Sequence, residues 1–155
     1  MAKKKLDVKT LKDLREKTGA GIMDVKRVMD EVGDPKKAEK ILKEKGFKKA
    51  AKRSDRATDA GLVDAYVHHS GKVASLVEVF SETDFVARNE LFQELAHGLA
   101  LQVASSEAKD SRQLLKEEFI KDPSKTIEDL VKEVILKTGE NIKVGRITRI
   151  KLGEK

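Results

Sequence analysis

Residues 61–80 read GLVDAYVHHSGKVASLVEVF, and they mark the point where a helical pattern gives way to a two-residue alternation. Val63, Ala65 and Val67 alternate with other residues in the way that is typical of a half-buried strand. The run HSGK then has the composition of a tight turn, and Val73–Phe80 follows it as a second strand. Two strands joined by so short a loop pair antiparallel, so we expect a β-hairpin.

Helices are expected after the hairpin. Apolar residues at helical spacing predict a long helix over residues 91–104, and a weaker helix is expected around Gln113–Lys121. The sequence Thr126–Asp129 resembles a capping box, which opens a third helix that stops at Thr138-Gly139.

A final strand, Ile142–Leu152, completes this part of the chain, and Gly145 interrupts its alternation in a way that indicates a β-bulge. The order β-β-α-α-α-β predicts a small antiparallel three-stranded sheet covered on one face by helices. We assign this α+β core to a domain of residues 61–155.

Only helices are expected on the N-terminal side of the hairpin. The spacing predicts Val8–Thr18, Ile22–Val32 and a third helix that begins at Asp34-Pro35 and ends at Gly46. Helices of about ten residues are not stable alone in water, so the three must pack together. They form a three-helix domain of residues 1–46.

A basic segment joins the two domains. Between Lys36 and Arg56 the chain has ten basic residues and three acidic ones. We expect residues 47–60 to be a helical or flexible linker, so the whole chain belongs to the α+β class.

Composition excludes several kinds of protein. The 155 residues contain no cysteine, which excludes disulfides, zinc ribbons and thiol nucleophiles and favours a reducing cytoplasm. Lys and Arg number 33 and Asp and Glu 27, so the formal net charge is +6, and no apolar run is long enough to span a membrane or to form a signal peptide. Aromatic residues make up 4%, too few for a platform that stacks nucleic-acid bases.

No arrangement of residues indicates catalysis. His68 and His69 are expected on opposite faces of a strand, where they cannot share a metal ion, and His97 lies on a helix among apolar or solvated neighbours. Gly19-Ala20-Gly21 follows a helix and lacks the third glycine of a dinucleotide loop, and the chain has no Walker loop and no hydrolase motif. We therefore expect a protein that is not an enzyme, with no metal site and no cofactor, which acts through its surfaces.

Residues 81–89, SETDFVARN, place two apolar side chains where the chain should turn at the surface. In one interpretation Thr83 or Asp84 caps a helix and Phe85 tucks beneath it as a hydrophobic staple. In the other, Phe85 is an apolar wedge beside a carboxylate and is offered to a partner. The local sequence leaves both open.

Two segments carry a resemblance to the elongation factor Ts family. Residues 14–26, LREKTGAGIMDVK, look like its N-terminal signature, and residues 78–88, EVFSETDFVAR, look like its second signature. The resemblance spans roughly Leu6 to Leu152. Phe80 and Met29 depart from the family pattern, where Asn and Leu are usual, and the chain has room for one core only, whereas longer members have two core subdomains and a coiled-coil insertion.

The resemblance implies a guanine-nucleotide exchange factor that binds the translational GTPase EF-Tu in the cytoplasm. It also implies that the three-helix domain is similar to the ubiquitin-associated (UBA-like) fold, and that the sheet domain forms a homodimer, as in compact members. Asp84 and Phe85 correspond to the pair that disturbs the partner's magnesium and phosphate site. The residues implied to contact EF-Tu are Leu14, Arg15, Ile22, Met23, Lys26, Thr83, Asp84, Phe85 and Val86.

Two alternatives belong to other classes. A basic RNA-binding or ribosome-associated protein would use Lys36–Arg56 to neutralise phosphates, although a lysine run on a helix is more often a solvated face. A ubiquitin-type adaptor would use the three-helix domain alone and leaves the turn at Asp84 without a role. We therefore prefer the exchange-factor interpretation and expect neither a nucleic acid nor a membrane as partner.

Overall fold

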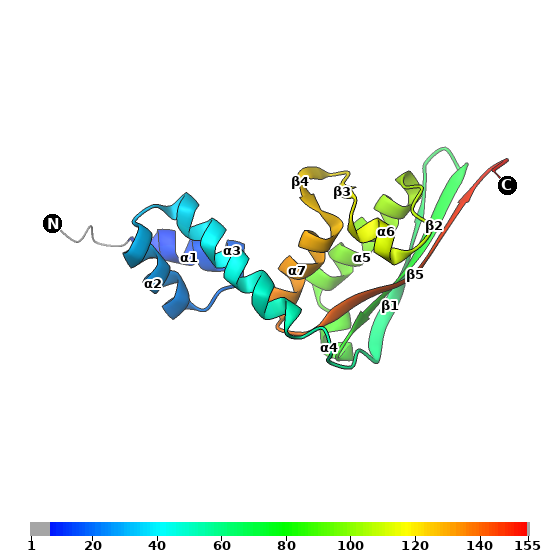
Figure 1. Ribbon diagram of the computed structural model, residues 1–155. Helices are drawn as coiled ribbons and strands as arrows, with labels where there is room; N and C mark the ends of the chain where they lie inside the picture. The colour runs from blue at the N-terminus through cyan, green and yellow to red at the C-terminus, as the bar shows by residue number, and fades with distance from the viewer. Residues whose placement is uncertain (1–6, 155) are drawn as a thin grey trace.

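A three-helix unit and a sheet unit lie at opposite ends of the molecule in the computed structural model, which describes residues 7–154 (Figure 1). The three-helix unit comprises α1 (Val8–Thr18), α2 (Ile22–Val32) and α3 (Pro35–Ala51). The sheet unit comprises β1 (Ala60–Val67), β2 (Val73–Ser81), α4 (Asp84–Ala87), α5 (Glu90–Ser105), α6 (Ser111–Leu115), β3 (Glu118–Phe119), β4 (Asp122–Thr126), α7 (Ile127–Thr138) and β5 (Ile142–Lys151).

Local signals set the ends of the first helices. Gly19 and Gly33 take the left-handed conformation, with φ of 65° and 63°, and so end α1 and α2 where the sequence predicts. Asp34 caps α3 by accepting a hydrogen bond from the Lys36 amide. A small aliphatic core holds the three helices together; it consists of Leu14, Val25, Val28, Met29, Ala38 and Leu42.

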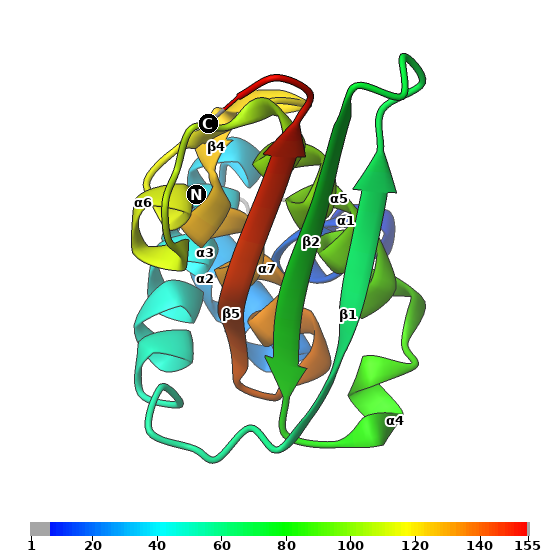
Figure 2. The ribbon, with the colours of Figure 1, turned by 90° about the vertical axis from the view of Figure 1, so that its right-hand side faces the viewer.

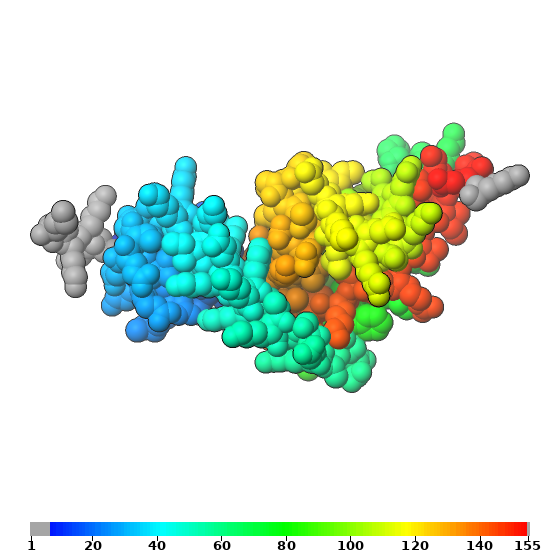
Figure 3. All heavy atoms as spheres, in the orientation of Figure 1, coloured from blue at the N-terminus to red at the C-terminus, as the bar shows by residue number. Residues whose placement is uncertain are grey.

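The expectation that the helix beginning at Asp34-Pro35 ends at Gly46 is wrong. α3 continues through Gly46 to Ala51, so the first part of the expected linker is helical. Gly46 lies against α7, where an added Cβ would come within 2.6 Å of Leu136 Cδ1. The glycine therefore permits a close approach of α7 to α3, and Ala50, one turn further on, is buried in the core of the sheet unit. Figure 3 shows α3 extending from the three-helix unit to the sheet unit.

The larger unit contains the expected antiparallel three-stranded sheet, in the order β1-β2-β5. Helices cover one face of this sheet and leave the other uncovered, as Figure 2 shows. The covered face packs Val77 and Val79 of β2 against the helices, with Phe92 and Leu99 of α5 fully buried beneath them. An α+β core of this kind agrees with the sequence prediction.

The first strand alternates as predicted, but Val63 and Val67 lie on the uncovered face and are 62% and 68% exposed. Leu62 and Tyr66 turn inward instead and pack against the core. Asp64 shares their face at the edge of the sheet, where its carboxylate lies 3.1 Å from the Nδ1 atom of His97 on α5. Alternation alone does not say which side of a strand the helices will cover.

The expectation of a weak helix around Gln113–Lys121 is also wrong for most of its length. One turn, α6, is followed by a small hairpin of β3 and β4. The side chain of Gln102 on α5 donates to the carbonyl of Glu118 and accepts from the amide of Ile120, so it provides the hydrogen bonds that a helix would have made internally. Phe119 is buried in the core as a result.

Two further sequence predictions are confirmed. Thr126 and Asp129 form a capping box at the start of α7, with a hydrogen bond in each direction. The pairing of β2 with β5 shifts register between Val77 and Val79, which places a bulge at Gly145. Among residues 7–154, no helix is both long and apolar enough to cross a membrane.

Candidate partner-binding surfaces

The turn from β2 into α4 presents Phe85 to solvent. Its side chain is 82% exposed, whereas that of its neighbour Val86 is 4% exposed and packs in the core. Thr83 caps the helix, and its side-chain oxygen accepts from the Val86 amide at 3.4 Å. The interpretation of Phe85 as a hydrophobic staple is therefore wrong, because Val86 is the buried residue.

Asp84 lies beside Phe85 in the first turn of α4 and is also exposed. A carboxylate at this end of a helix is stabilised by the free amide groups. The structure thus places an apolar ring and a negative charge side by side on one protruding turn.

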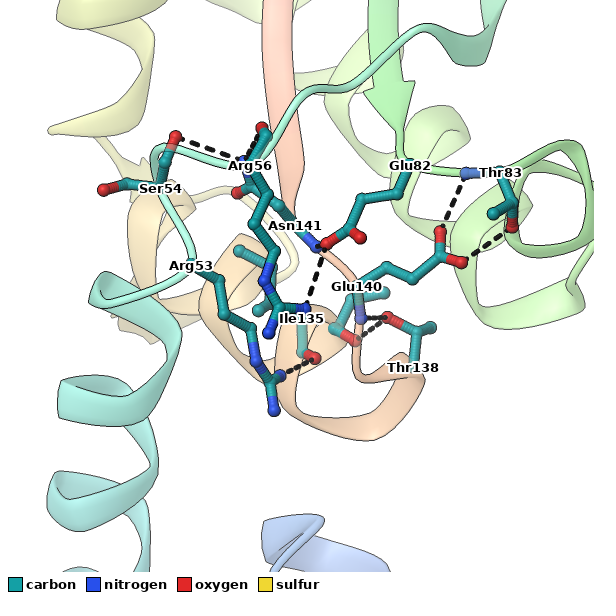
Figure 4. A network of polar contacts seen from close by, with 10 residues as sticks. Arg53, Ser54, Arg56, Glu82, Thr83, Ile135, Thr138, Glu140 and Asn141 are labelled. Carbon is teal, nitrogen blue, oxygen red and sulfur yellow. Dashed lines mark hydrogen bonds and ion pairs between the residues drawn. The ribbon is translucent and has the colours of Figure 1, made fainter.

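Polar contacts hold Thr83, at the start of this turn, as Figure 4 shows. The carboxylate of Glu140, in the turn between α7 and β5, accepts from the Thr83 amide at 3.1 Å and from the Thr83 hydroxyl at 2.7 Å. The carboxylate of Glu82 accepts from the Asn141 amide at 2.6 Å and lies 3.5 Å from Arg56. The turn after β2 therefore contacts two segments that are distant in the sequence, the turn after α7 and the segment at Arg56.

Exposed apolar residues also occur at the start of α2. Met23 is 74% exposed and lies off the apolar stripe that the sequence of α2 forms at helical spacing, whereas Ile22, which belongs to that stripe, is 42% exposed. Arg15 and Lys26 are exposed on the same unit. These four residues present a mixed apolar and basic surface.

Asp24 interrupts this surface with a pair of ion contacts. Its carboxylate lies 3.2 Å from Lys49 Nζ on α3 and 2.5 Å from Arg27 on its own helix. The hydrogen bond from Lys49 and its positive charge lower the pKa of Asp24 from the usual value. Asp24 thereby ties the start of α2 to α3.

Two of the nine residues expected to contact the partner are buried. Leu14 is 3% exposed in the core of the three-helix unit, and Val86 is buried as described. Both have a supporting role, because each fills the core beneath an exposed neighbour. The other seven lie in two separate groups, one on α1 and α2 and one at α4.

The structure places two of the histidine rings close together. The rings of His68 and His69 lie 4.1 Å apart, so the expectation that they point away from each other is wrong; His69 lies in the turn after β1 rather than on the strand. Within residues 7–154, no three His, Asp or Glu side chains are placed to hold a metal ion.

The uncovered side of the sheet is a surface that sequence reasoning missed. We call it the outer sheet face; it consists of Val63, Ala65, Val67, Leu76, Thr148 and Ile150. Within this face, on the central strand, Glu78 accepts two side-chain hydrogen bonds from Arg146, at 3.0 and 2.5 Å, and these bonds lower the pKa of Glu78 to about 2. The alternation of β1 was the available signal, but it does not distinguish an inner from an outer face.

The residues behind Phe85 were missed as well. Glu82 stands within the second signature and Glu140 and Asn141 lie outside both signatures, and nothing in their local pattern indicates that they meet. Their association depends on the packing of α7 against the sheet.

Proteins similar in sequence to this chain are named Elongation factor Ts. Residues 82–155 match the family model described as Elongation factor TS. A protein of Clostridium botulinum (strain ATCC 19397 / Type A) named Elongation factor Ts is 46% identical over 146 residues, which cover 94% of this chain and 48% of that protein. One of Clostridium kluyveri (strain NBRC 12016) with the same name is 46% identical over 141 residues, covering 90% and 46%.

The chain spans about half the length of the curated relatives it matches. The match nevertheless runs through both units of the fold, because it takes in at least nine-tenths of this chain. In sequence, this chain is similar to members of the elongation factor Ts family.

Proposed function

We propose that this protein is a guanine-nucleotide exchange factor that binds GDP-loaded EF-Tu in the cytoplasm and promotes the release of GDP. Relatives that share 46% of its residues are named Elongation factor Ts. The observation that carries the proposal is the 82% exposure of Phe85 on a turn that is held in place from behind.

Exchange of this kind needs no catalytic side chain. A protein that binds the nucleotide-free GTPase more tightly than the GDP-bound form must weaken GDP binding by the same factor, because linkage is reciprocal. Shifting such an equilibrium from 1:99 to 99:1 takes about 5.5 kcal/mol of differential binding. Burial of one phenylalanine contributes roughly 1.5–3 kcal/mol, so Phe85 needs a second contact surface.

The three-helix unit supplies that surface in our proposal. We propose that this unit is UBA-like; Ile22 and Met23 are exposed on it, as are Arg15 and Lys26. A methionine adapts its shape to an apolar partner surface. Docking through this unit brings the α4 turn to the nucleotide site.

Phe85 and Asp84 act there by different means. The ring displaces elements of the partner that hold the magnesium ion, and the carboxylate of Asp84 repels the phosphates of GDP as a like charge. GTP later displaces the factor through the same linkage.

We further propose that two copies of this chain associate through the outer sheet face. Val63, Val67, Leu76 and Ile150 expose apolar side chains on one uncovered side of the sheet. Exposed apolar surface of this kind is typical of a protein contact. A second copy then supplies the core that longer relatives carry within one chain.

A release assay tests the exchange proposal. EF-Tu loaded with fluorescent GDP is mixed with the protein, and the release rate is followed for wild type, Phe85→Ala and the control Ile120→Ala. Ile120 is also an exposed apolar residue but lies in the β3–β4 turn. We expect Phe85→Ala to slow release about tenfold or more, since a buried phenylalanine contributes roughly 1.5–3 kcal/mol.

The melting temperature separates this role from a structural one. Substitution of an exposed side chain changes stability by about 0.5 kcal/mol or less, so Phe85→Ala should melt close to wild type. A large drop in melting temperature with unchanged release per folded molecule would contradict the proposal. A salt-dependent shift of RNA mobility, without any effect on GDP release, would instead favour the RNA-binding alternative.

A further inference from the structure

We propose that Glu140 is a positioning residue for nucleotide exchange: it holds the turn at Thr83 in the conformation that projects Phe85. The inference rests on the proposed function, since it assigns a support to the residue that acts on the partner. Glu140 itself lies in the turn between α7 and β5 and touches no partner surface in this proposal.

The contacts of Glu140 are directed at the start of α4. One carboxylate oxygen accepts from the Thr83 amide at 3.1 Å, and the other accepts from the Thr83 hydroxyl at 2.7 Å (Figure 4). The same hydroxyl oxygen accepts from the Val86 amide at 3.4 Å. The three groups therefore form a chain of hydrogen bonds that runs from Glu140 into the helix.

Helix α4 needs this support because it is one turn long. It spans Asp84–Ala87, and a single turn does not form by itself, since nucleation fixes several residues in return for one hydrogen bond. Burial of Val86 and Ala87 holds one side of the turn, whereas Glu140 holds its N-terminal end. The Ser81 hydroxyl also donates to the Thr83 carbonyl at 2.9 Å. Phe85 is 82% exposed, so its direction follows from these supports rather than from packing of the ring itself.

The turn that carries Glu140 also fastens the segment leaving the three-helix unit. Asn141 is 3% exposed, and its side-chain amide donates to the carbonyls of Ser54 at 3.3 Å and Arg56 at 3.0 Å. Arg53 donates to the carbonyl of Ile135 at the end of α7. One turn thus contacts both the chain that leads from the docking unit and the turn that bears Phe85, so it fixes the two surfaces relative to each other.

The first test separates positioning from docking. The variant Glu140→Gln keeps the size of the side chain but removes the charge that strengthens both hydrogen bonds and leaves one acceptor oxygen for the two donors of Thr83. The control Glu107→Gln makes the same chemical change at an exposed site in the loop after α5. GDP release from EF-Tu is measured against concentration of each protein, which yields a maximal rate and a half-saturation concentration.

We expect Glu140→Gln to lower the maximal rate about tenfold while the half-saturation concentration stays within twofold. A tenfold loss corresponds to about 1.4 kcal/mol in the barrier. Glu107→Gln should match wild type in both quantities. An unchanged maximal rate for Glu140→Gln, or an effect confined to half-saturation, would overturn the inference.

Amide hydrogen exchange of the free protein provides a readout that does not need EF-Tu. The amides of Thr83 and Val86 should exchange about tenfold faster in Glu140→Gln than in wild type, and those of the three-helix unit should not change. If wild type fails to release GDP, the proposed function is lost, and this measurement still decides whether Glu140 holds the turn. Equal exchange rates at Thr83 and Val86 would show that it does not.

A double-mutant cycle with Thr83→Val guards against general loss of structure. Valine keeps the shape of threonine but removes its hydroxyl. If Glu140 acts through Thr83, the double variant should lose no more of the maximal rate than the worse single variant. Additive losses would indicate independent effects and would overturn the inference.

Discussion

Apolar residues one or two positions apart differ in exposure at both proposed contact surfaces. Phe85 is exposed and Val86 is buried, because successive side chains on a helix point about 100° apart. On α2, Met23 is exposed while Val25 is buried in the core of the unit. In each pair the buried residue fixes the backbone and the exposed one remains free to contact a partner.

Replacement of Met23 by aspartate tests the surface of the three-helix unit. Met23→Asp should raise the half-saturation concentration for GDP release about tenfold or more, since a buried methionine contributes roughly 1.5–3 kcal/mol. The helical circular dichroism signal should not change, because the side chain is 74% exposed. Val8→Asp, which adds the same charge at another exposed position of this unit, should leave half-saturation unchanged. A cooperative loss of the helical signal in Met23→Asp would place Met23 in the core.

The pairing of β5 with β2 contains a bulge, and two charged side chains lie next to each other there. Glu78 accepts from the backbone amide of Arg146 at 2.9 Å as well as from its side chain. These bonds favour the ionised carboxylate and lower the pKa of Glu78 from its usual 4.5 to about 2. The pair therefore makes the sheet sensitive to acid.

The direction of this pH dependence follows from the lowered pKa. The unfolded chain takes up a proton at Glu78 near pH 4.5 and the folded chain near pH 2, so the stabilisation is complete above pH 4.5 and is lost as the pH falls toward 2. The urea midpoint of Glu78→Gln should lie below that of wild type at pH 7, and the two should converge near pH 2. The control Glu107→Gln should follow wild type throughout. A constant difference between Glu78→Gln and wild type across this range would contradict the assignment.

The molecule as a whole has one broad face that no helix covers. If two copies associate through the outer sheet face, an added charge at its centre should separate them, because burial of a lysine in an apolar contact is costly. Leu76→Lys should sediment as a monomer at a concentration where wild type sediments with twice the monomer mass. Ile120→Lys, at a second exposed apolar site, should remain a dimer. A monomeric wild type would remove the basis for the dimer.

Much of the architecture was predictable because its signals are local. The ends of α1 and α2 follow from Gly19 and Gly33, and the start of α7 follows from the capping box at Thr126. The exposure of Met23 also agrees with its position off the apolar stripe. Each of these signals acts within a few residues, where sequence and conformation correspond directly.

Other features depend on residues that are distant in the chain. The sequence around Gly46 indicates a helix end, and only the contact with Leu136 explains why a glycine stands inside α3. The alternation of β1 is equally compatible with Val63 or with Leu62 facing the core. The support of Thr83 by Glu140 joins residues 57 positions apart. Caps, helical faces and strand alternation are thus encoded locally. The support behind the direction of Phe85 arises only when the turn after α7 meets the turn after β2, and the uncovered sheet face is decided when α5 packs against β1 and β2.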